Sequence, residues 1–466
     1  MFEVFAVYFS VLVALVEGNS FIMDNLSLLG LSGEVFTNFL PSWGGLVKNL
    51  NPFMAFALAA VCFIATRIVV KLCKLLFSPI ILTRRLEEAG YIPDERHTLR
   101  DVAEHTRRLK NAGDFPPVFP NGWFEVMGSQ DLKVGNVKHV SCLGENLAVF
   151  RGEDGVVCIV DAYCPHLGAN LGVGGQVVGN CLQCPFHGWK FRGDDGKCSE
   201  IPYSKNIPEY AKVKSWPCLE RNGSILMWYH AEEVEPSWLP EEIEDVTSGK
   251  WTYRGFTEHF VNCHIEEIPE NAADMNHFNF LHSSPILAGQ DLRYSFTSKW
   301  IDYFHHDWEA TWSPLDGDQK HVSELRLVHY ACAFGFRIPF LDFRVIARQV
   351  GPGLVNLYFK SSFGDGVMIQ TLTPQEPLLQ KMTHRIFGEN MLFTCIAKSF
   401  LLAESIQVER DIMVWNHKKY LSKPLLVKED HLILKHRRWY SQFYSKNSPK
   451  FNAGNKKPSN NNKLDW

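Results

Sequence analysis

The chain has 466 residues, which is enough for about three folded domains. Its 47 Lys and Arg residues against 51 Asp and Glu residues give a formal net charge of −4, so no strong positive field is available to bind nucleic acid. The composition is 46% hydrophobic and 13% aromatic, as expected of a folded protein. The 12 Cys residues follow no regular framework, which excludes a small disulfide-stapled secreted module and favours reduced or metal-bound thiols.

Two apolar stretches occupy the N-terminal region. The first, Phe5 to Val16, is short for a membrane span. It could be a signal peptide, a membrane anchor or a second span, and the sequence leaves these three alternatives open. The second, Phe53 to Val70, has the length and apolar character of a transmembrane helix. We place that helix at 51–77, after an apolar stretch and lumenal loop at 1–50. Basic residues are concentrated after the helix, so the positive-inside rule predicts a cytosolic catalytic body on a membrane, that of the endoplasmic reticulum.

The sequence then changes character at three points. Residues 78–119 are charged and end in a Pro-rich, helix-breaking segment, which predicts a juxtamembrane linker. Residues 120–231 hold short β-type runs between Gly and Asp turn signals and predict an all-β domain. Strand-like and helix-like segments mix over 232–445, which is an α+β pattern. Residues 446–466 are rich in Asn, Lys, Ser and Pro and predict a disordered tail.

Two Cys-His pairs stand in the predicted all-β domain. Cys164-Pro-His166 is followed by Cys184-Pro-Phe-His187-Gly-Trp. A Rieske-type 2Fe-2S cluster needs two thiolates on one iron and two imidazoles on the other, and two such loops supply them. Zinc accepts the same four ligands, so a structural zinc site is the alternative. The flanking Pro and Gly residues, which allow tight turns, favour the Rieske cluster over zinc.

A second candidate metal site lies downstream, where His277 and His282 are separated by four residues. In a regular α-helix the two side chains would diverge by roughly 140°, so the helix must bulge or end between them. Mononuclear non-haem iron takes two His and one carboxylate on one face. Asp274 precedes His277 by three residues, either as that carboxylate or as a hydrogen-bond acceptor for an imidazole N–H.

With both motifs in this order, residues 120 to 420 resemble the Rieske-type non-haem iron oxygenases. The resemblance implies an all-β Rieske domain followed by an α+β catalytic domain of helix-grip fold. It implies a third iron ligand on a C-terminal helix, where Asp411 matches and Glu404 and Glu409 compete. It also implies that Asp274 bridges the mononuclear Fe(II) site to the Rieske cluster of a neighbouring subunit in a homotrimer. A separate reductase would deliver electrons from NAD(P)H for use with O2.

Within this family, the runs C-P-H-L-G-A-N-L-G-V-G-G and D-G-K-C…I-P-Y resemble the animal cholesterol 7-desaturases, the Neverland group. The bacterial 3-ketosteroid 9α-hydroxylases are more distant. The closer resemblance implies conversion of cholesterol to 7-dehydrocholesterol, an early step of steroid hormone biosynthesis of the ecdysteroid or dafachronic acid type. A sterol substrate also fits the predicted membrane helix.

Two alternatives stay open on the sequence. One is a Rieske monooxygenase that hydroxylates another steroid or lipophilic molecule. The other is a membrane-bound Rieske electron carrier, which would need residues 120–231 and no second iron. Phe278, Phe280 and Trp300 are candidates to line a sterol cavity, although packing in a core is the commoner use of such residues.

Overall fold

The computed structural model describes residues 52–93, 95–110 and 114–451. The chain divides into two units after Ser78. The predicted N-terminal stretch and lumenal loop at 1–50, and most of the predicted tail at 446–466, lie outside the described residues.

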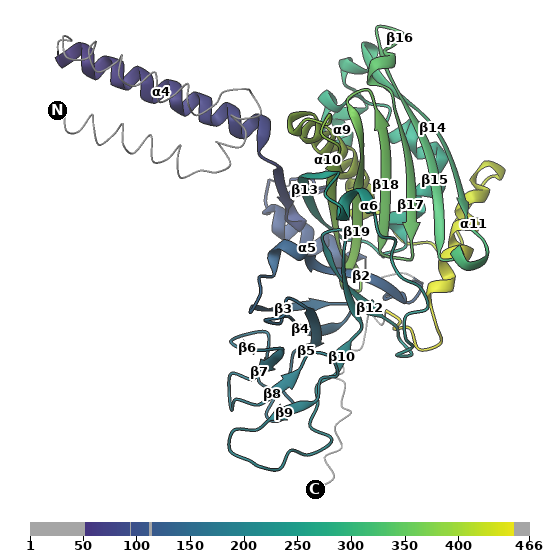
Figure 1. The fold of residues 1–466 in the computed structure, drawn as a ribbon. Coiled ribbons are helices and arrows are strands. Elements are labelled where there is room, and N and C mark those ends of the chain that lie inside the picture. Colours follow the sequence, from purple (N-terminus) through teal and green to yellow (C-terminus); the bar gives the residue numbers. More distant parts are fainter. Residues whose placement is uncertain (1–51, 94, 111–113, 452–466) are drawn as a thin grey trace. The chain divides into compact units, whose positions relative to one another are not determined.

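The predicted membrane-spanning segment forms a helix, α4 (Pro52–Phe77; Figure 1). Arg67 interrupts its apolar run, and Lys71 and Lys74 follow. Among the described residues, no helix is long and apolar enough to cross a membrane, so the prediction of a transmembrane anchor is not supported.

The predicted all-β domain consists of three small antiparallel sheets. Their strand orders are β11-β12-β2, β10-β5-β4-β3 and β6-β7-β8-β9. The turns fit the sequence signals: Asn222 and Gly223 join β11 to β12 with φ of 51° and 79°, the left-handed pair that a two-residue hairpin requires. The strands are β2 (Gly122–Gly128), β3 (Val137–Cys142), β4 (Glu145–Arg151), β5 (Val157–Asp161), β6 (Gln176–Val178), β7 (Cys181–Gln183), β8 (Lys190–Arg192), β9 (Cys198–Glu200), β10 (Ser215–Trp216), β11 (Cys218–Arg221) and β12 (Ser224–Tyr229).

The second domain is built on a nine-stranded sheet in the order β1-β13-β20-β19-β18-β17-β15-β14, with β16 paired to β15. Only β1 runs parallel to its neighbour within this sheet. The strands are β1 (Ile80–Arg84), β13 (Thr252–Val261), β14 (Phe304–Pro314), β15 (Val322–Ala333), β16 (Phe336–Arg337), β17 (Phe343–Val350), β18 (Leu354–Ser361), β19 (Gly364–Glu376) and β20 (Leu379–Gly388). The sheet mixed with helices confirms the predicted α+β class.

The segment 78–119 is more than the linker that the sequence predicted. It contributes strand β1 to the edge of the catalytic sheet and a charged helix, α5 (Leu99–Leu109), whose first turn is capped by Thr98. The apolar run at Ile80 to Leu82 follows an apolar helix directly, so the sequence pattern does not separate the two. The edge strand forms because β13 offers a free row of backbone groups beside β20.

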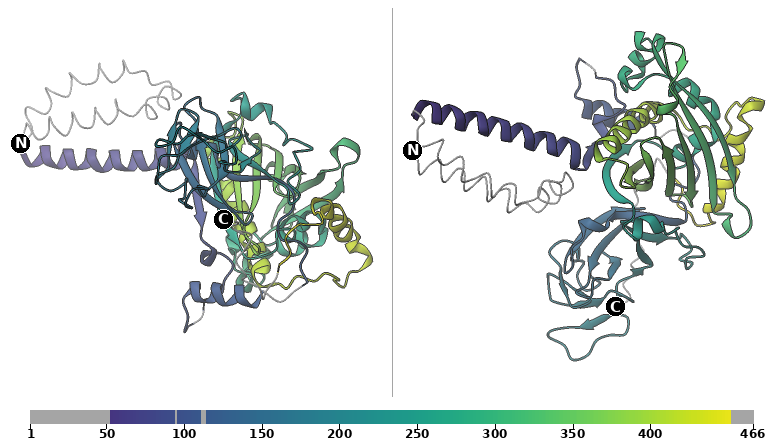
Figure 2. Two further views of the ribbon diagram at one scale, coloured as in Figure 1. Left: turned by 90° about the horizontal axis from the view of Figure 1, so that it is seen from below. Right: turned by 45° about the horizontal axis from the view of Figure 1, so that its top comes forward.

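The long helix α10 (Thr394–His417) packs against β13 and β20, as Figures 1 and 2 show. Ala397, Leu401 and Ile412 lie on its buried side at helical spacing, and Ala397 and Leu401 share a core cluster with Ile386 of β20. Further helices complete the domain: α6 (Glu244–Thr247), α7 (Glu267–Glu270), α8 (Met275–Leu281), α9 (Leu292–Ser295) and α11 (His431–Tyr440).

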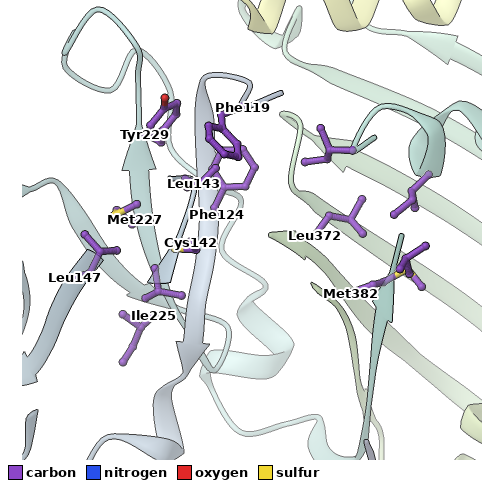
Figure 3. Close-up of a cluster of buried hydrophobic side chains, with 14 of the residues drawn as sticks. Phe119, Phe124, Cys142, Leu143, Leu147, Ile225, Met227, Tyr229, Leu372 and Met382 are labelled. Atoms are coloured by element: carbon purple, nitrogen blue, oxygen red, sulfur yellow. The ribbon is translucent and has the colours of Figure 1, made fainter. Parts of the chain in front are cut away.

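One apolar core continues from the all-β domain into the catalytic sheet. Figure 3 shows Phe124 and Ile225 on one side and Leu372 and Met382 on the other, all members of one buried cluster. Beside this core a buried ion pair joins Glu125 of β2 to Arg385 of β20 at 2.6 Å. Threonine hydroxyls of β19 and β20 donate to the same carboxylate, so the charge is both paired and hydrogen-bonded.

Candidate metal centres

Two matching loops of the all-β domain carry the Cys-His pairs. Cys164 and His166 lie between β5 and β6, and Cys184 and His187 lie between β7 and β8. In each loop the cysteine N–H donates to the carbonyl five residues later, and the cysteine carbonyl accepts from a glycine N–H four residues later. Both glycines have positive φ, 74° and 73°, which another residue would adopt only with strain. Each loop therefore presents one thiol and one imidazole in the same way.

The four side chains converge at the ends of these loops. The rings of His166 and His187 lie 4.7 Å apart, and Trp189 stacks on His166 at 4.8 Å. Burial, together with a smaller effect of the adjacent Cys184 thiol, raises the pKa of the Cys164 thiol to about 11. Nδ1 of His166 is buried and has no hydrogen-bond partner among the described residues. Two facing thiols and an imidazole nitrogen left open fit the donor set of a Rieske-type 2Fe-2S cluster.

The second candidate centre starts at a helix end. Helix α8 carries His277 in its first turn and stops at Leu281, so His282 follows in a non-helical conformation (φ −102°, ψ 7°). The sequence required the helix to bulge or end between the two histidines, and it ends. The two ring centroids lie 5.1 Å apart as a result.

Asp411 of α10 completes this group. Its Oδ2 lies 3.3 Å from Nε2 of His282, and the donor atoms of Asp411, His277 and His282 all lie within 4.8 Å of one another. Asn271 donates to the other carboxylate oxygen at 3.0 Å, which leaves Oδ2 facing the histidines. Burial lowers the pKa of His277, whereas for His282 the nearby Asp411 carboxylate outweighs burial and raises the pKa.

Hydrogen bonds fix the orientation of both imidazoles. Nδ1 of His282 lies 2.9 Å from Oε1 of Gln407, which in turn accepts from the buried Arg410 at 2.9 Å. Nδ1 of His277 bonds to the carbonyl of Asp274. Each ring therefore uses Nδ1–H as a donor to the protein and keeps the lone pair of Nε2 for a metal. No sequence pattern pointed to Gln407 or Arg410, because their partners come from a distant segment.

The three carboxylate candidates on α10 separate clearly. Glu409 pairs with Arg84 at 3.0 Å, and Glu404 lies 3.1 Å from Nε2 of His384. Asp411 alone among them joins the two histidines. Asp274 is not a member of that group; its side chain accepts from the backbone N–H of His277 and caps α8.

A cavity of about 160 Å³ opens onto this group. Its walls are mainly apolar, with a few amide and hydroxyl groups. The lining residues include His277, His282, Asp411, Phe278, Trp312, Leu325, Leu357, Met382 and Gln370. Of the three apolar candidates from the sequence, Phe278 lines the cavity, Phe280 is exposed to solvent instead, and the side chain of Trp300 lies outside the described residues.

Two imidazoles and one carboxylate on one side of a cavity can hold a metal such as Fe(II) and leave positions free for O2. Together with the cysteine-histidine loops on an all-β domain, this arrangement defines the class of Rieske-type oxygenases. Two family models match the chain accordingly: the Rieske [2Fe-2S] domain over residues 122–216, and the 3-ketosteroid 9alpha-hydroxylase C-terminal domain over residues 227–444.

Curated relatives show to which family of Rieske-type oxygenases the chain is similar. A cholesterol 7-desaturase of Xenopus laevis is 52% identical over 80% of this chain and 82% of its own length. A cholesterol 7-desaturase of Caenorhabditis elegans is 43% identical over 83% of this chain and 92% of its own length. The oxygenase component of a Rhodococcus rhodochrous 3-ketosteroid-9-alpha-monooxygenase is 28% identical over 76% of this chain. The chain belongs to the cholesterol 7-desaturase family.

Solved structures agree with the fold. Dicamba monooxygenase bound to 3,6-dichlorosalicylic acid superposes with a TM-score of 0.52 at 17% identity and covers 70% of this chain and 98% of its own. A mutant of NdmA from Pseudomonas putida CBB5 with caffeine gives a TM-score of 0.51 at 20% identity, covering 72% of this chain and 91% of its own. The fold of this chain is therefore similar to that of these solved structures.

Proposed function

We propose that this chain is a cholesterol 7-desaturase, which removes two hydrogens from cholesterol to give 7-dehydrocholesterol at an early step of steroid hormone biosynthesis. The observation that carries the proposal is the meeting of His277, His282 and Asp411 at one wall of an apolar cavity, in a chain whose relatives are named for this reaction. The reaction uses O2 and two electrons, supplied from NAD(P)H by a separate reductase.

Each site residue has a part in this proposal. Cys164, Cys184, His166 and His187 would hold the 2Fe-2S cluster, and His277, His282 and Asp411 would hold Fe(II). The iron, when bound, supplies O2 activation. The protein supplies position: Gln407 keeps Nε2 of His282 directed at the metal, and the apolar walls hold the sterol ring system with water excluded.

Asp274 connects the two centres across subunits in this proposal. Its side chain is partly exposed beside His277, and among the described residues its hydrogen bond is the one that caps α8. His187 is partly exposed at the end of its loop. In a homotrimer, the carboxylate of Asp274 would accept a hydrogen bond from a Rieske imidazole of the neighbouring subunit and so link the cluster to His277.

The substitution D274N tests that link. Asn caps a helix nearly as well as Asp, so α8 and the bound iron are expected to persist. Turnover is expected to fall by at least about tenfold, because an electron must then cross without the charged bridge. Mononuclear iron content, Rieske absorption and sterol turnover are measured together. Loss of iron would make Asp274 part of the iron site instead, and full turnover would remove the bridge.

The product of the reaction tests the function. Membranes or detergent extracts containing the protein and its electron donors are incubated with cholesterol, and the sterols are analysed by mass spectrometry, with H277A as the matched control. We expect a product lighter by two hydrogens with the ultraviolet absorbance of a conjugated 5,7-diene, absent in H277A. Unchanged cholesterol, with both centres filled and reducible, would contradict the proposal.

One observation favours a second candidate. The family model that covers the catalytic domain is named for a steroid hydroxylase, so hydroxylation of a steroid is the competing reaction of the same site. The choice between desaturation and hydroxylation depends on which C–H bonds of the substrate face the iron, since an error of about 1 Å in position changes reaction rates greatly. A product heavier by one oxygen would establish hydroxylation and exclude desaturation.

A further inference from the structure

A second group of metal-ligating side chains lies on the face of the catalytic sheet that is turned away from the cavity. His305 and Asp307 are two residues apart on β14 and so point to the same face. Cys332 of β15 is the cross-strand partner of His305 and shares that face. The alternate residues of β14, His306 and Trp308, point to the inner face, where both pack near His329.

The distances within this group suit a tetrahedral ion. Sγ of Cys332 lies 3.5 Å and Nε2 of His305 lies 3.7 Å from the same carboxylate oxygen of Asp307. All three donor atoms lie within 4.8 Å of one another. Metal–ligand bonds of about 2.0–2.3 Å at tetrahedral angles place ligand atoms about 3.3–3.6 Å apart, so two of the three spacings need only small adjustments.

The nearest cation does not fill the space. Arg337 of β16 pairs with Cys332 in the sheet, but its Nε donates to Asp342 at 2.8 Å. Among the described residues no Lys or Arg forms an ion pair with Asp307, whose carboxylate instead contacts Cys332 and His305.

We propose that His305, Asp307 and Cys332 bind Zn²⁺ with a water molecule in the fourth position. A thiolate, an imidazole and a carboxylate are the ligand types that zinc takes, whereas Ca²⁺ and Mg²⁺ prefer oxygen. On binding, the Cys332 thiol gives up its proton to solvent and the lone pair of Nε2 of His305 completes the set.

Zinc here joins β14 to β15. The same two strands carry Trp308 and His329 on the inner face, and Nε1 of Trp308 donates to the carbonyl of His282 at 3.1 Å. The ion therefore stabilises the pair of strands that supports the second candidate centre. The proposal does not depend on which sterol reaction that centre performs.

Differential alkylation of the full-length protein, with its iron centres loaded, tests the site. The protein is treated with iodoacetamide with and without added Zn²⁺, and each cysteine-containing peptide is quantified by mass spectrometry. Cys332 is expected to be protected by zinc, and Cys395 of α10, which is equally half-buried, is the internal control. No protection of Cys332, or equal protection of both cysteines, would overturn the proposal.

Affinity gives a second measurement. Competition with a chromophoric chelator is expected to show one Zn²⁺ site per chain that weakens at least about 100-fold in C332S and in H305N. C395S is expected to keep the site. The visible absorption of the Rieske cluster reports whether each variant has folded. Unchanged zinc affinity in both C332S and H305N would contradict the assignment.

Discussion

The two candidate iron centres are assembled in opposite ways. In the all-β domain, four ligands come from two short loops with the same backbone geometry, and each loop follows directly from its own sequence motif. In the catalytic domain, two ligands come from the end of α8 and the third from α10, and the contact that fixes Asp411 spans 140 residues of sequence. A local site is encoded by a motif, whereas the distant ligand depends on the whole sheet being folded between the two helices.

The largest expected effect separates the two centres. D411A removes the carboxylate that only the folded sheet brings to the histidines, so turnover should fall at least about 1,000-fold. The Rieske absorption spectrum should be unchanged, because its loops lie in another domain. Steady-state turnover and the visible spectrum are measured on one preparation. Retained turnover would place the third ligand elsewhere.

The next largest effect is expected at the buried ion pair between the two domains, Glu125 with Arg385. E125Q leaves the Arg385 guanidinium buried without its charge partner, which costs about 3–5 kcal/mol of unfolding free energy. The exposed pair of Lys250 with Asp245 is the control, and D245N should leave the free energy of unfolding almost unchanged. Chemical denaturation measures both. Equal effects of the two substitutions would mean that burial does not determine how much an ion pair contributes to the free energy of unfolding.

The same carboxylate makes a pH prediction. Burial opposes ionisation of Glu125, but Arg385 outweighs it and lowers the pKa. A carboxyl with a lower pKa in the folded state contributes stability above its unfolded pKa, and this contribution is lost as the pH falls through the folded value. Unfolding free energy should therefore decrease below about pH 4.5, the ordinary value for Glu, and E125Q should lack that part of the decrease. Identical pH profiles would contradict this.

A smaller effect is expected from the hydrogen bond that orients His282. Q407L removes the acceptor with little change of shape, and metal affinity or activity should fall about 10- to 100-fold. Q407E keeps an oxygen acceptor at the same place and should stay close to the unsubstituted protein. Iron content after dialysis against a chelator, together with turnover, measures both. Equal losses in Q407L and Q407E would show that Gln407 acts by packing alone.

The smallest effect is expected next to the Rieske loops. Cys181 stands three residues before Cys184, but its thiol lies 3.5 Å from the Ser199 hydroxyl on β9. C181S should leave the Rieske spectrum unchanged and the unfolding free energy within about 0.5 kcal/mol. A changed spectrum would extend the cluster site beyond the two motifs.

The sequence was informative where the physics is local. The Cys-His spacing identified both loops. Because His277 and His282 cannot share one face of a regular helix, the sequence predicted a bulge or an end between them, and the structure shows an end. Gly and Asp turn signals between short β-type runs predicted the all-β domain. Asp411 was reached through the family resemblance rather than through any pattern of its own.

The features that could not be predicted from the sequence depend on contacts between distant segments. Gln407 and Arg410 act on a segment more than a hundred residues away, and an ordinary helix surface gives no sign of it. Strand β1 was taken as part of a linker because only β13 makes it a strand. The prediction of a transmembrane anchor is not supported among the described residues. Many residues of the cavity wall lie at alternate positions of strands β14 to β20, where the sequence pattern is that of ordinary core strands.

Iron and acid-labile sulfide per chain test most directly whether the chain holds two separate metal centres. A Rieske cluster alone contains two irons and two sulfides, so the account predicts a third iron, without further sulfide, in the unsubstituted protein. In D411A prepared in parallel, the third iron should be lost and the other two kept. Two irons in both proteins would contradict the account and identify the chain as a Rieske electron carrier.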